Sequence, residues 1–416
     1  MTKKLFFITT RLFWPTDSGR KLSLYYYCKG LHDRYNCDIY LYSFLEAGQS
    51  KKDLDNIPPF IKEVKLAEPI RKSVKLHNLI WNTFVARKWP IQCSLFYSDK
   101  NKKAIHDYVQ NIKPDYIFVD MIRTAMYFTA FKDTKCLKVL DMDDLLSARY
   151  EKQLHSKYKS NISGQYANSM SSLANLIVNN GTVRNFILNV EKKLTRKAEI
   201  LYSGLYDKVI FVSDVETSYI NKIIPNKAVT IPVGINTSNV DKRVAKAEKN
   251  TLTFVGNLNV AANVDSLRWI ISDILPLVKH PVRFMVIGKC PDSVRDEYKD
   301  NNHIVFTGRV VNLAEYVQKG QLFLSPLLYG TGIKTKILEA MSMGVPVVTN
   351  QVGAEGINAE NGSEIMIADS EKDIAEIVDK ILDNPTIAEK IADKARLLAE
   401  SKYSWNKIWD KFGTIL

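Results

Sequence analysis

The chain has 416 residues, with 58 Lys and Arg against 45 Asp and Glu, so its formal net charge is +13. This length predicts about two domains with substantial cores, and no apolar run approaches the roughly 18 residues of a membrane-spanning helix. The N-terminus MTKKLFFITT lacks the features of a signal peptide. Five scattered cysteines show neither a disulfide framework nor metal-ligand spacing. Together these features predict a protein of the reducing cytoplasm.

The positive charge is confined to the first part of the chain. Residues 1–240 hold 36 Lys and Arg against 22 Asp and Glu, a balance of +14, and the remainder holds 22 against 23, a balance of −1. Such basicity often serves only solubility. It also suits an anionic partner of the first domain, either a phospholipid surface or a lipid diphosphate.

The first elements alternate between strand and helix. The pattern predicts a strand at 3–10, a helix at 20–34 and a strand at 38–44, which opens a doubly wound parallel sheet. The intervening loop, 11–19, contains no G-x-G-x-x-G, so a dinucleotide cofactor is not expected. Trp14 in this loop either packs beneath it or faces a ligand.

Residues 71–97 interleave basic residues with Trp81, Phe84, Trp89 and Phe96. Two interpretations remain open. The commoner one is a core helix with a solvated basic face. The alternative is contact with a membrane interface, where aromatic rings lie at headgroup depth while Lys and Arg meet anionic lipid.

Two strands of the first domain end in acidic residues. The strands at 114–120 and 137–141 end at Asp120 and Asp141, and the carboxyl ends of parallel strands border the ligand crevice. Asp120 and Asp141 are therefore the candidates that orient an acceptor hydroxyl or take its proton. Asp143 and Asp144 follow directly, and either could instead cap the next helix. We assign no role to any of the six histidines.

The rest of the chain predicts further helices and a second doubly wound unit. Long helices are expected within 150–206, and a charged linker near 234–250. The predicted strands are 208–212, 251–257, 284–288 and 304–310, and the predicted C-terminal helices lie within 371–401 and 403–416.

The most informative stretch is 322–356, LFLSPLLYGTGIKTKILEAMSMGVPVVTNQVGAEG. It predicts a strand, a loop with Gly330 and Gly332, a helix at about 333–343 and a second strand at 345–349. A glycine loop before a helix N-terminus suits phosphate. Glu339 would lie about six residues beyond the helix start, roughly 9 Å along the axis, where a carboxylate can accept two hydroxyls of a sugar. Lys336 and Glu339 could also form an ordinary surface pair.

The segment GTGIKTKILEAMSMGVPVVTNQVGAEGI strongly resembles the nucleotide-sugar site of retaining family-4 glycosyltransferases with the GT-B fold. The resemblance implies that Glu339 binds the ribose and that the loop amides with Lys336 hold the diphosphate. Many members carry an earlier Glu at the position of Thr331, so this contact to the donor sugar is missing or replaced here. The donor-binding residues implied by the resemblance are Gly19, Gly256, Asn257, Arg309, Val310, Gly330, Thr331, Gly332, Ile333, Lys336 and Glu339.

The resemblance also implies the fold and the reaction. We expect two Rossmann-like domains with parallel sheets facing a central cleft, an acceptor-binding domain at 1–236 and a nucleotide-sugar domain at 237–402, with the helix at 403–416 returning to the first domain. The expected reaction is retaining transfer of a sugar, from a UDP-sugar more than a GDP-sugar, to a glycan or polyprenyl-diphosphate-glycan acceptor in bacterial polysaccharide biosynthesis. No metal or other cofactor is expected, because the helix dipole and Lys336, the third catalytic candidate, replace the cation.

Two other classes of function remain. A GT-B sugar-nucleotide epimerase would bind the same donor without an acceptor. A non-catalytic basic protein would bind polynucleotide in a salt-sensitive way. No nucleic-acid-binding motif is present, so no nucleic-acid partner is expected. We expect a cytoplasmic protein, with the inner face of the plasma membrane as a peripheral site.

Overall fold

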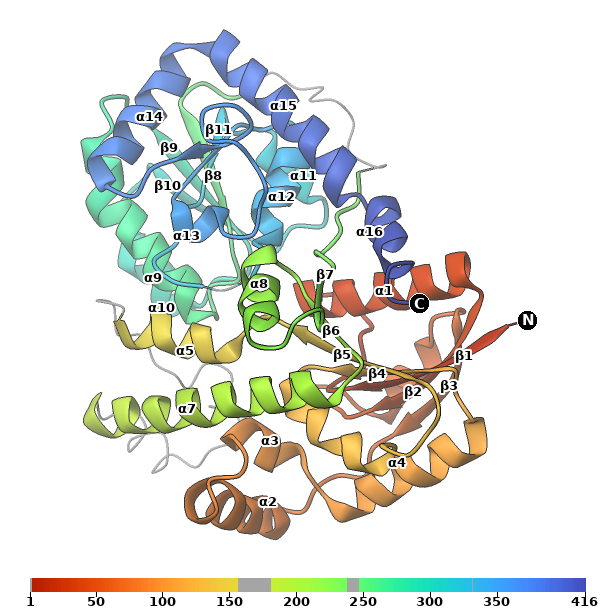
Figure 1. Cartoon of the computed structure of the whole chain (residues 1–416). Coiled ribbons are helices and arrows are strands. Elements are labelled where there is room, and N and C mark those ends of the chain that lie inside the picture. Colours follow the sequence, from red (N-terminus) through yellow and green to blue (C-terminus); the bar gives the residue numbers. More distant parts are fainter. Residues whose placement is uncertain (1, 156–180, 238–246, 331) are drawn as a thin grey trace. The chain divides into compact units, whose positions relative to one another are not determined.

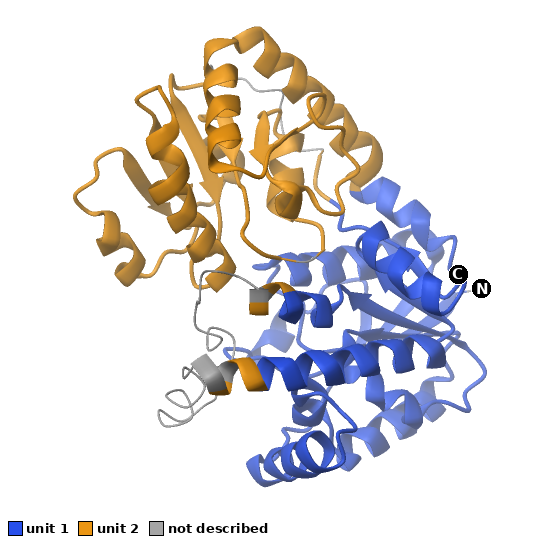
Figure 2. Ribbon diagram, turned by 60° about the vertical axis from the view of Figure 1, so that its left-hand side comes forward, with its two compact units in different colours: residues 1–151, 187–234, 405–416 blue, residues 152–186, 235–404 orange. Residues whose placement is uncertain are grey.

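The computed structural model describes residues 2–155, 181–237, 247–330 and 332–416. Contacts between residues divide the chain into unit 1, comprising Met1–Glu151, Ile187–Gly234 and Trp405–Leu416, and unit 2, comprising Lys152–Phe186 and Ile235–Ser404 (Figure 2). Most of the predicted linker, and residues 156–180, lie outside the described residues. Within the described ranges, no helix combines the length and apolarity needed to cross a bilayer.

Unit 1 is built on a seven-stranded sheet in the order β3-β2-β1-β4-β5-β6-β7, and every neighbouring pair is parallel (Figure 1). The strands are β1 (Lys3–Thr9), β2 (Cys37–Ser43), β3 (Ile61–Leu66), β4 (Tyr116–Asp120), β5 (Leu137–Asp143), β6 (Lys208–Phe211) and β7 (Ala228–Thr230). The helices of this part of the chain are α1 (Gly19–Tyr35), α2 (Lys72–Asn78), α3 (Ile91–Phe96), α4 (Asp99–Ile112), α5 (Leu146–His155), α7 (Gly181–Leu205), α8 (Asp214–Ile223) and α16 (Trp405–Phe412).

Successive residues of β1 face opposite layers of helices, as the two-residue period of a strand requires. Leu5 and Phe7 belong to a core that includes residues of α1 and α16. Phe6 and Ile8 belong to a second core that includes residues of α4 and α7. Both faces of the sheet are covered, which explains why its strands are almost continuously apolar.

The C-terminal helix α16 returns to unit 1 and packs in its core, so this prediction is confirmed. Trp405 is 4% exposed and stacks on Tyr26 with ring centroids 4.6 Å apart. Gly234 lies against the same indole, because a Cβ at this position would approach Trp405 to 2.4 Å. Trp405 therefore anchors the chain end, as expected from the sequence.

Unit 2 is built on a six-stranded parallel sheet in the order β10-β9-β8-β11-β12-β13. The strands are β8 (Thr251–Val255), β9 (Arg283–Ile287), β10 (Ile304–Gly308), β11 (Leu322–Leu324), β12 (Val347–Thr349) and β13 (Met366–Ile367). The helices are α9 (Ala261–Trp269), α10 (Asp292–Arg295), α11 (Leu313–Val317), α12 (Thr335–Ser342), α13 (Gln351–Ala354), α14 (Glu371–Asp383) and α15 (Pro385–Tyr403). The predicted fold class, two doubly wound parallel-sheet units, is confirmed.

Candidate functional site

The glycine loop of unit 2 joins β11 to α12, as predicted, but the helix begins later than expected. Gly332 has a φ of +64°, a backbone conformation that glycine adopts without steric cost. Ile333 is 9% exposed and belongs to the core, and Lys334 is extended, so α12 starts at Thr335. Glu339 lies four residues beyond this start, about 6 Å along the axis rather than the predicted 9 Å. Thr331 lies outside the described residues.

Lys336, on the second residue of α12, faces the end of β8. Its Nζ donates to Asn263 Oδ1 at 3.2 Å and lies 4.5 Å from the centroid of the Phe254 ring. Burial, together with repulsion from Lys334, lowers the pKa of Lys336 to about 7. Burial thus disfavours the charged form of Lys336, and an anionic ligand beside the ammonium group would favour that form.

Glu339 lies one turn further along α12 and is half-buried. Burial raises the pKa of its carboxyl group to about 7. Among the residues that the structure describes, its carboxylate has no hydrogen-bond donor and forms no ion pair with Lys336. The alternative of an ordinary surface pair is therefore wrong, because both side chains are partly buried and no ion pair joins them.

Gly256 and Asn257, the donor-side residues predicted after β8, lie near Lys336 because Asn263 contacts both Asn257 and Lys336. Asn263 of α9 donates its Nδ2 to the backbone oxygen of Asn257 at 3.0 Å, while its Oδ1 accepts from Lys336. Asn263 thus links the end of β8 to α12. The sequence analysis did not predict a role for Asn263. The backbones of Gly256 and Gly288 also lie close together, since a Cβ on Gly288 would approach Gly256 O to 2.2 Å.

Three further donor-side candidates lie close to α12 or to the loop before it. Val310 and Ile333 contribute to one apolar cluster with Ile337, and Gly330 lies near Lys334, whose Cε would be 3.0 Å from an added Cβ. Arg309 follows β10 and is exposed. Unit 2 therefore brings most of the predicted donor residues to the carboxyl end of its sheet, where ligands of such sheets bind.

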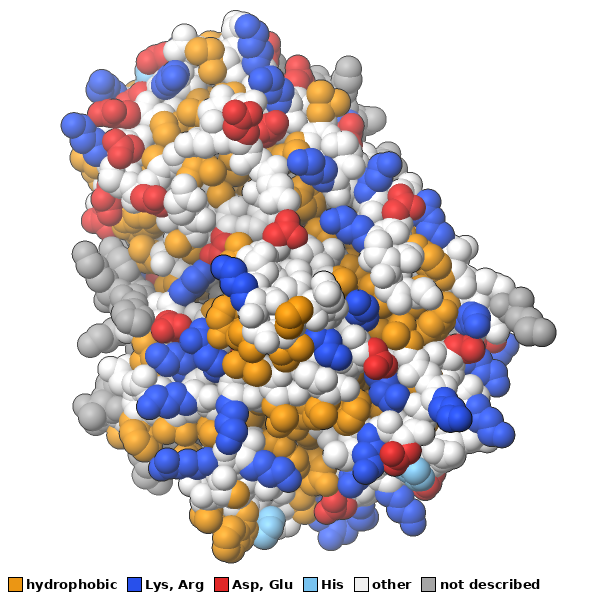
Figure 3. All heavy atoms as spheres, in the orientation of Figure 1, with side chains coloured by type: hydrophobic (Ala, Val, Ile, Leu, Met, Phe, Trp, Pro, Cys, Tyr) orange, Lys and Arg blue, Asp and Glu red, His pale blue; other side chains and the backbone are white. Residues whose placement is uncertain are grey.

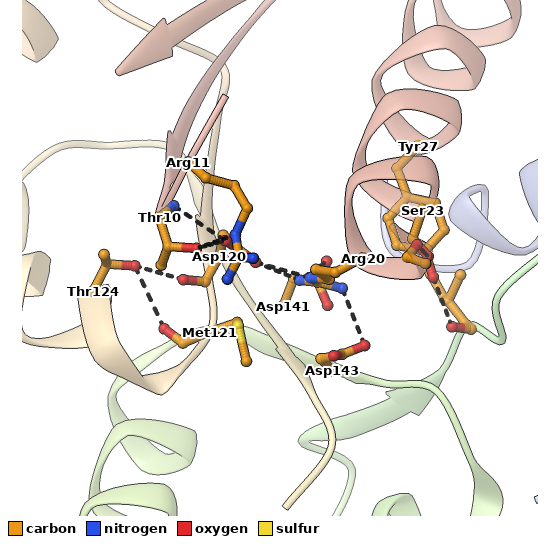
Figure 4. Close-up of polar contacts among 12 residues, drawn as sticks. Thr10, Arg11, Arg20, Ser23, Tyr27, Asp120, Met121, Thr124, Asp141 and Asp143 are labelled. Carbon is orange, nitrogen blue, oxygen red and sulfur yellow. Dashed lines mark hydrogen bonds and ion pairs between the residues drawn. The ribbon is translucent and has the colours of Figure 1, made fainter. Parts of the chain in front are cut away.

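In unit 1, Asp120 at the end of β4 pairs in register with Asp141 of β5, two residues before that strand ends, and the two acids share one arginine (Figure 4). Arg20 Nη2 lies 2.6 Å from Asp120 Oδ1 and 2.9 Å from Asp141 Oδ2, and Arg20 Nη1 lies 3.2 Å from Asp143 Oδ1. Thr10 completes the shell by donating its Oγ1 to Asp120 Oδ2 at 2.7 Å. Sequence reasoning missed Arg20, although three acids at the ends of buried strands require a nearby cation.

The three acids of this cluster differ in the direction of their pKa shifts. Burial acts to raise the pKa of Asp120, but Arg20, Arg11 and Thr10 outweigh it and the pKa is lowered. Burial raises the pKa of Asp141 to about 6, with Asp143 and Asp120 adding to the rise against Arg20. Burial also raises the pKa of Asp143.

Burial changes the interpretation of the two acceptor-side candidates. The side chains of Asp120 and Asp141 are 0% and 1% exposed, whereas that of Asp143 is 22% exposed. A direct contact of Asp120 or Asp141 with an acceptor therefore does not fit this structure. Their contacts instead fix Arg20, and Asp143 is the acid of the cluster that solvent reaches.

The structure also places three other residues named in the sequence analysis. Gly19 begins α1 directly before Arg20. Trp14 is 5% exposed and donates to the backbone oxygen of Asp53 at 2.7 Å, so it packs beneath its loop. Asp144 pairs with Arg149, while the buried Glu199 accepts a hydrogen bond from the Ser147 backbone at the start of α5.

This arrangement suits two different chemical tasks. Unit 2 presents a cation, a carboxylate and a glycine loop at a helix start, which together fit an anionic group and a diol. Unit 1 presents a buried arginine–carboxylate cluster at the edge of its sheet. The two parallel sheets and their helix layers are those of a GT-B fold.

Comparisons with known proteins agree with this class. Residues 249–384 match the model of the family described as glycosyl transferases group 1. The chain is 24% identical over 349 residues to an uncharacterized 44.6 kDa protein in the cps region of Klebsiella pneumoniae, covering 75% of this chain and 87% of that protein.

Solved structures share the fold over the whole chain. A sucrose-phosphate synthase from Thermosynechococcus elongatus is 14% identical with a TM-score of 0.70, covering 99% of this chain and 98% of the other. HepE of Anabaena, solved in complex with UDP and glucose, is 14% identical with a TM-score of 0.65 over the same shares. TarM is 12% identical with a TM-score of 0.67, covering 100% and 99%. The family match and the fold together support a glycosyltransferase.

Proposed function

We propose that this chain is a retaining glycosyltransferase that moves a sugar from a nucleotide-diphosphate sugar, a UDP-sugar in preference to a GDP-sugar, to a hydroxyl of a lipid-linked glycan. The observation that carries the proposal is a pair of partly buried ionisable groups on α12 that have no ionic partner among the described residues. Lys336 and Glu339 lie one turn apart, and both have a pKa displaced to about 7. A diphosphate at the helix start and a ribose diol one turn further along would compensate both.

The residues of unit 2 would act mainly on the leaving group. The bond between the anomeric carbon and the diphosphate oxygen breaks while the acceptor oxygen bonds to the same carbon, and the acceptor proton passes to the departing diphosphate. Lys336 and the amides at the start of α12 would stabilise the charge that develops on this diphosphate. Attack on the face that the diphosphate leaves would retain the anomeric configuration without an enzymic nucleophile.

Unit 1 would bind the acceptor beside the Arg20 cluster. Asp143 is its most exposed acid and is the group we expect to contact an acceptor hydroxyl, with Arg20, Asp120 and Asp141 positioning it. The relative in a cps region favours polysaccharide biosynthesis as the setting, on the cytoplasmic face of the plasma membrane.

Calorimetric titration with UDP, GDP and UMP, with and without Mg²⁺, tests the donor site. We expect micromolar binding of UDP that does not depend on magnesium, weaker binding of UMP, and loss of binding in Glu339→Ala. Absence of binding by every diphosphate, or unchanged affinity in Glu339→Ala, would contradict the proposal. Incubation of a UDP-sugar with acceptor, followed by assignment of the product anomer by NMR, tests retention and distinguishes transfer from epimerisation.

A further inference from the structure

The segment 71–88 exposes most of its large apolar side chains and buries two uncharged polar ones, Asn78 and Thr83. It consists of α2 and a π-helix at Leu79–Val85. Its exposed large apolar residues are Val74 at 36%, Leu76 at 59%, Ile80 at 49%, Trp81 at 53%, Phe84 at 47% and Val85 at 58%. Hydrophobic side chains gather over α2 at the bottom of the view in Figure 3.

The buried side of the same segment is held by hydrogen bonds. Asn78, 5% exposed, donates to the backbone oxygens of Ser94 and Tyr97 at 3.1 and 2.9 Å. Thr83, 0% exposed, shares a hydrogen bond of 2.8 Å with Ser94 Oγ. A surface helix normally turns its apolar stripe inward. The first interpretation of this segment, a core helix with a solvated basic face, is therefore wrong for 71–88.

The charged residues within this segment have one sign. Residues 71–88 contain five basic residues, Arg71, Lys72, Lys75, Arg87 and Lys88, and no Asp or Glu occurs between Glu68 and Asp99. Lys72, Arg87 and Lys88 are exposed, and Lys75 is partly exposed. An apolar face with two aromatic residues, on a segment whose charged residues are all cations, is complementary to the interface of an anionic bilayer.

We propose that the outward face of 71–88 docks unit 1 on an anionic phospholipid surface, with Ile80, Trp81 and Phe84 entering the headgroup layer. The lysines and arginines at both ends of the segment meet the lipid phosphates. This surface extends the proposed use of a lipid-linked acceptor, because it would hold the acceptor-binding unit at the membrane that carries the acceptor.

Vesicle flotation of the full chain without donor or acceptor tests the surface. We expect binding to phosphatidylcholine vesicles that contain phosphatidylglycerol, little binding to phosphatidylcholine alone, and release by high salt. The triple substitution Ile80→Ser, Trp81→Ser and Phe84→Ser should lower partitioning at least about tenfold. Leu397→Ser, which changes an apolar side chain 64% exposed on α15, should not change it.

A charge variant tests the second half of the proposal. Lys72→Gln with Lys75→Gln should lower partitioning about 25-fold at low salt, from about fivefold for each cation at an anionic surface. Lys299→Gln with Lys390→Gln, both exposed in unit 2, is the matched control.

Partitioning that survives the triple substitution, or that falls equally in the controls, would overturn the proposal. A change in oligomeric mass with unchanged vesicle binding would also overturn it and assign the face to a protein interface. UDP titration of the triple variant reports the donor site separately, so failure of the membrane surface is distinguishable from failure of the donor site.

Discussion

Replacing Glu339 by Gln should stabilise the protein while weakening donor binding. The carboxyl group is half-buried, and burial raises its pKa from 4.5 to about 7. The folded state therefore holds this proton more tightly than the unfolded state, and wild-type stability falls as the pH rises from about 4.5 through 7. A neutral amide of the same shape removes this loss.

The size of the effect follows from the pKa. At about 1.4 kcal/mol for each pKa unit, the rise from 4.5 to about 7 corresponds to at most about 3.5 kcal/mol at pH 8, and partial solvation reduces this to about 1–3 kcal/mol. For a folding unit of the size of unit 2, the melting temperature should rise by about 2 to 10 °C at pH 8. At pH 4.5 the difference should shrink below about 0.5 kcal/mol, because most of the penalty is then absent in the wild type.

Donor binding should change in the opposite direction. Hydrogen bonds to a charged group contribute about 1.5–3 kcal/mol each, and the amide retains only part of this for two ribose hydroxyls. A loss of about 2–3 kcal/mol predicts a 30- to 150-fold higher Kd for UDP at pH 8. At pH 6 most of Glu339 carries a proton, so binding to the wild type should release a proton that the variant does not release.

The assay combines thermal unfolding at pH 4.5 and 8 with calorimetric titration of UDP in two buffers that differ in ionisation enthalpy. Glu389→Gln, an exposed glutamate on α15, is the control and should change neither quantity. A Glu339→Gln protein that binds UDP as the wild type does, or that is less stable at pH 8, would refute the assignment of Glu339 to a ligand.

Three further predictions concern other parts of the chain. Lys336→Met should raise the Kd for UDP at least about tenfold and leave that for uridine within about twofold by calorimetry, since only the diphosphate loses a partner. Arg20→Met should cost about 3–5 kcal/mol in urea unfolding at pH 7, because it leaves three carboxylates uncompensated, and the cost should shrink near pH 4 as they protonate; an undiminished cost would contradict this. Gly234→Ala should lower stability by about 1–3 kcal/mol through its clash with Trp405, and restoration in Gly234→Ala/Trp405→Leu would support that cause.

Much of unit 2 could be predicted from sequence because its information is local. The strand at Leu322–Leu324 and the loop glycines follow from apolar runs and turn residues within a few positions. The start of α12 was misplaced by two residues, because Ile333 continues the helical apolar pattern but packs into the core before the helix begins. Periodicity alone does not separate these two uses of an apolar residue.

Long-range contacts explain what the sequence did not predict. Asn263 reaches Lys336 across 73 positions, and nothing in its own helix marks it as a ligand-side residue. Arg20 meets Asp120 and Asp141 only because β4 and β5 are neighbours at the centre of the sheet. The acidic residues themselves could have indicated Arg20, since several buried carboxylates need a cation from an adjacent loop or helix.

The partly buried charged groups of the two sites differ in whether they have an ionic partner, and this difference indicates where a ligand is needed. Arg20 gives Asp120, Asp141 and Asp143 an ionic partner from within unit 1, so these acids are paired without a bound molecule. Lys336 and Glu339 have no such compensation among the described residues, and both lose part of their charge near pH 7. Selection for stability alone would replace such residues, since uncompensated charges cost folding free energy. Their presence on one helix, one turn apart, is therefore best explained by a ligand that supplies an anion to one and hydroxyl groups to the other.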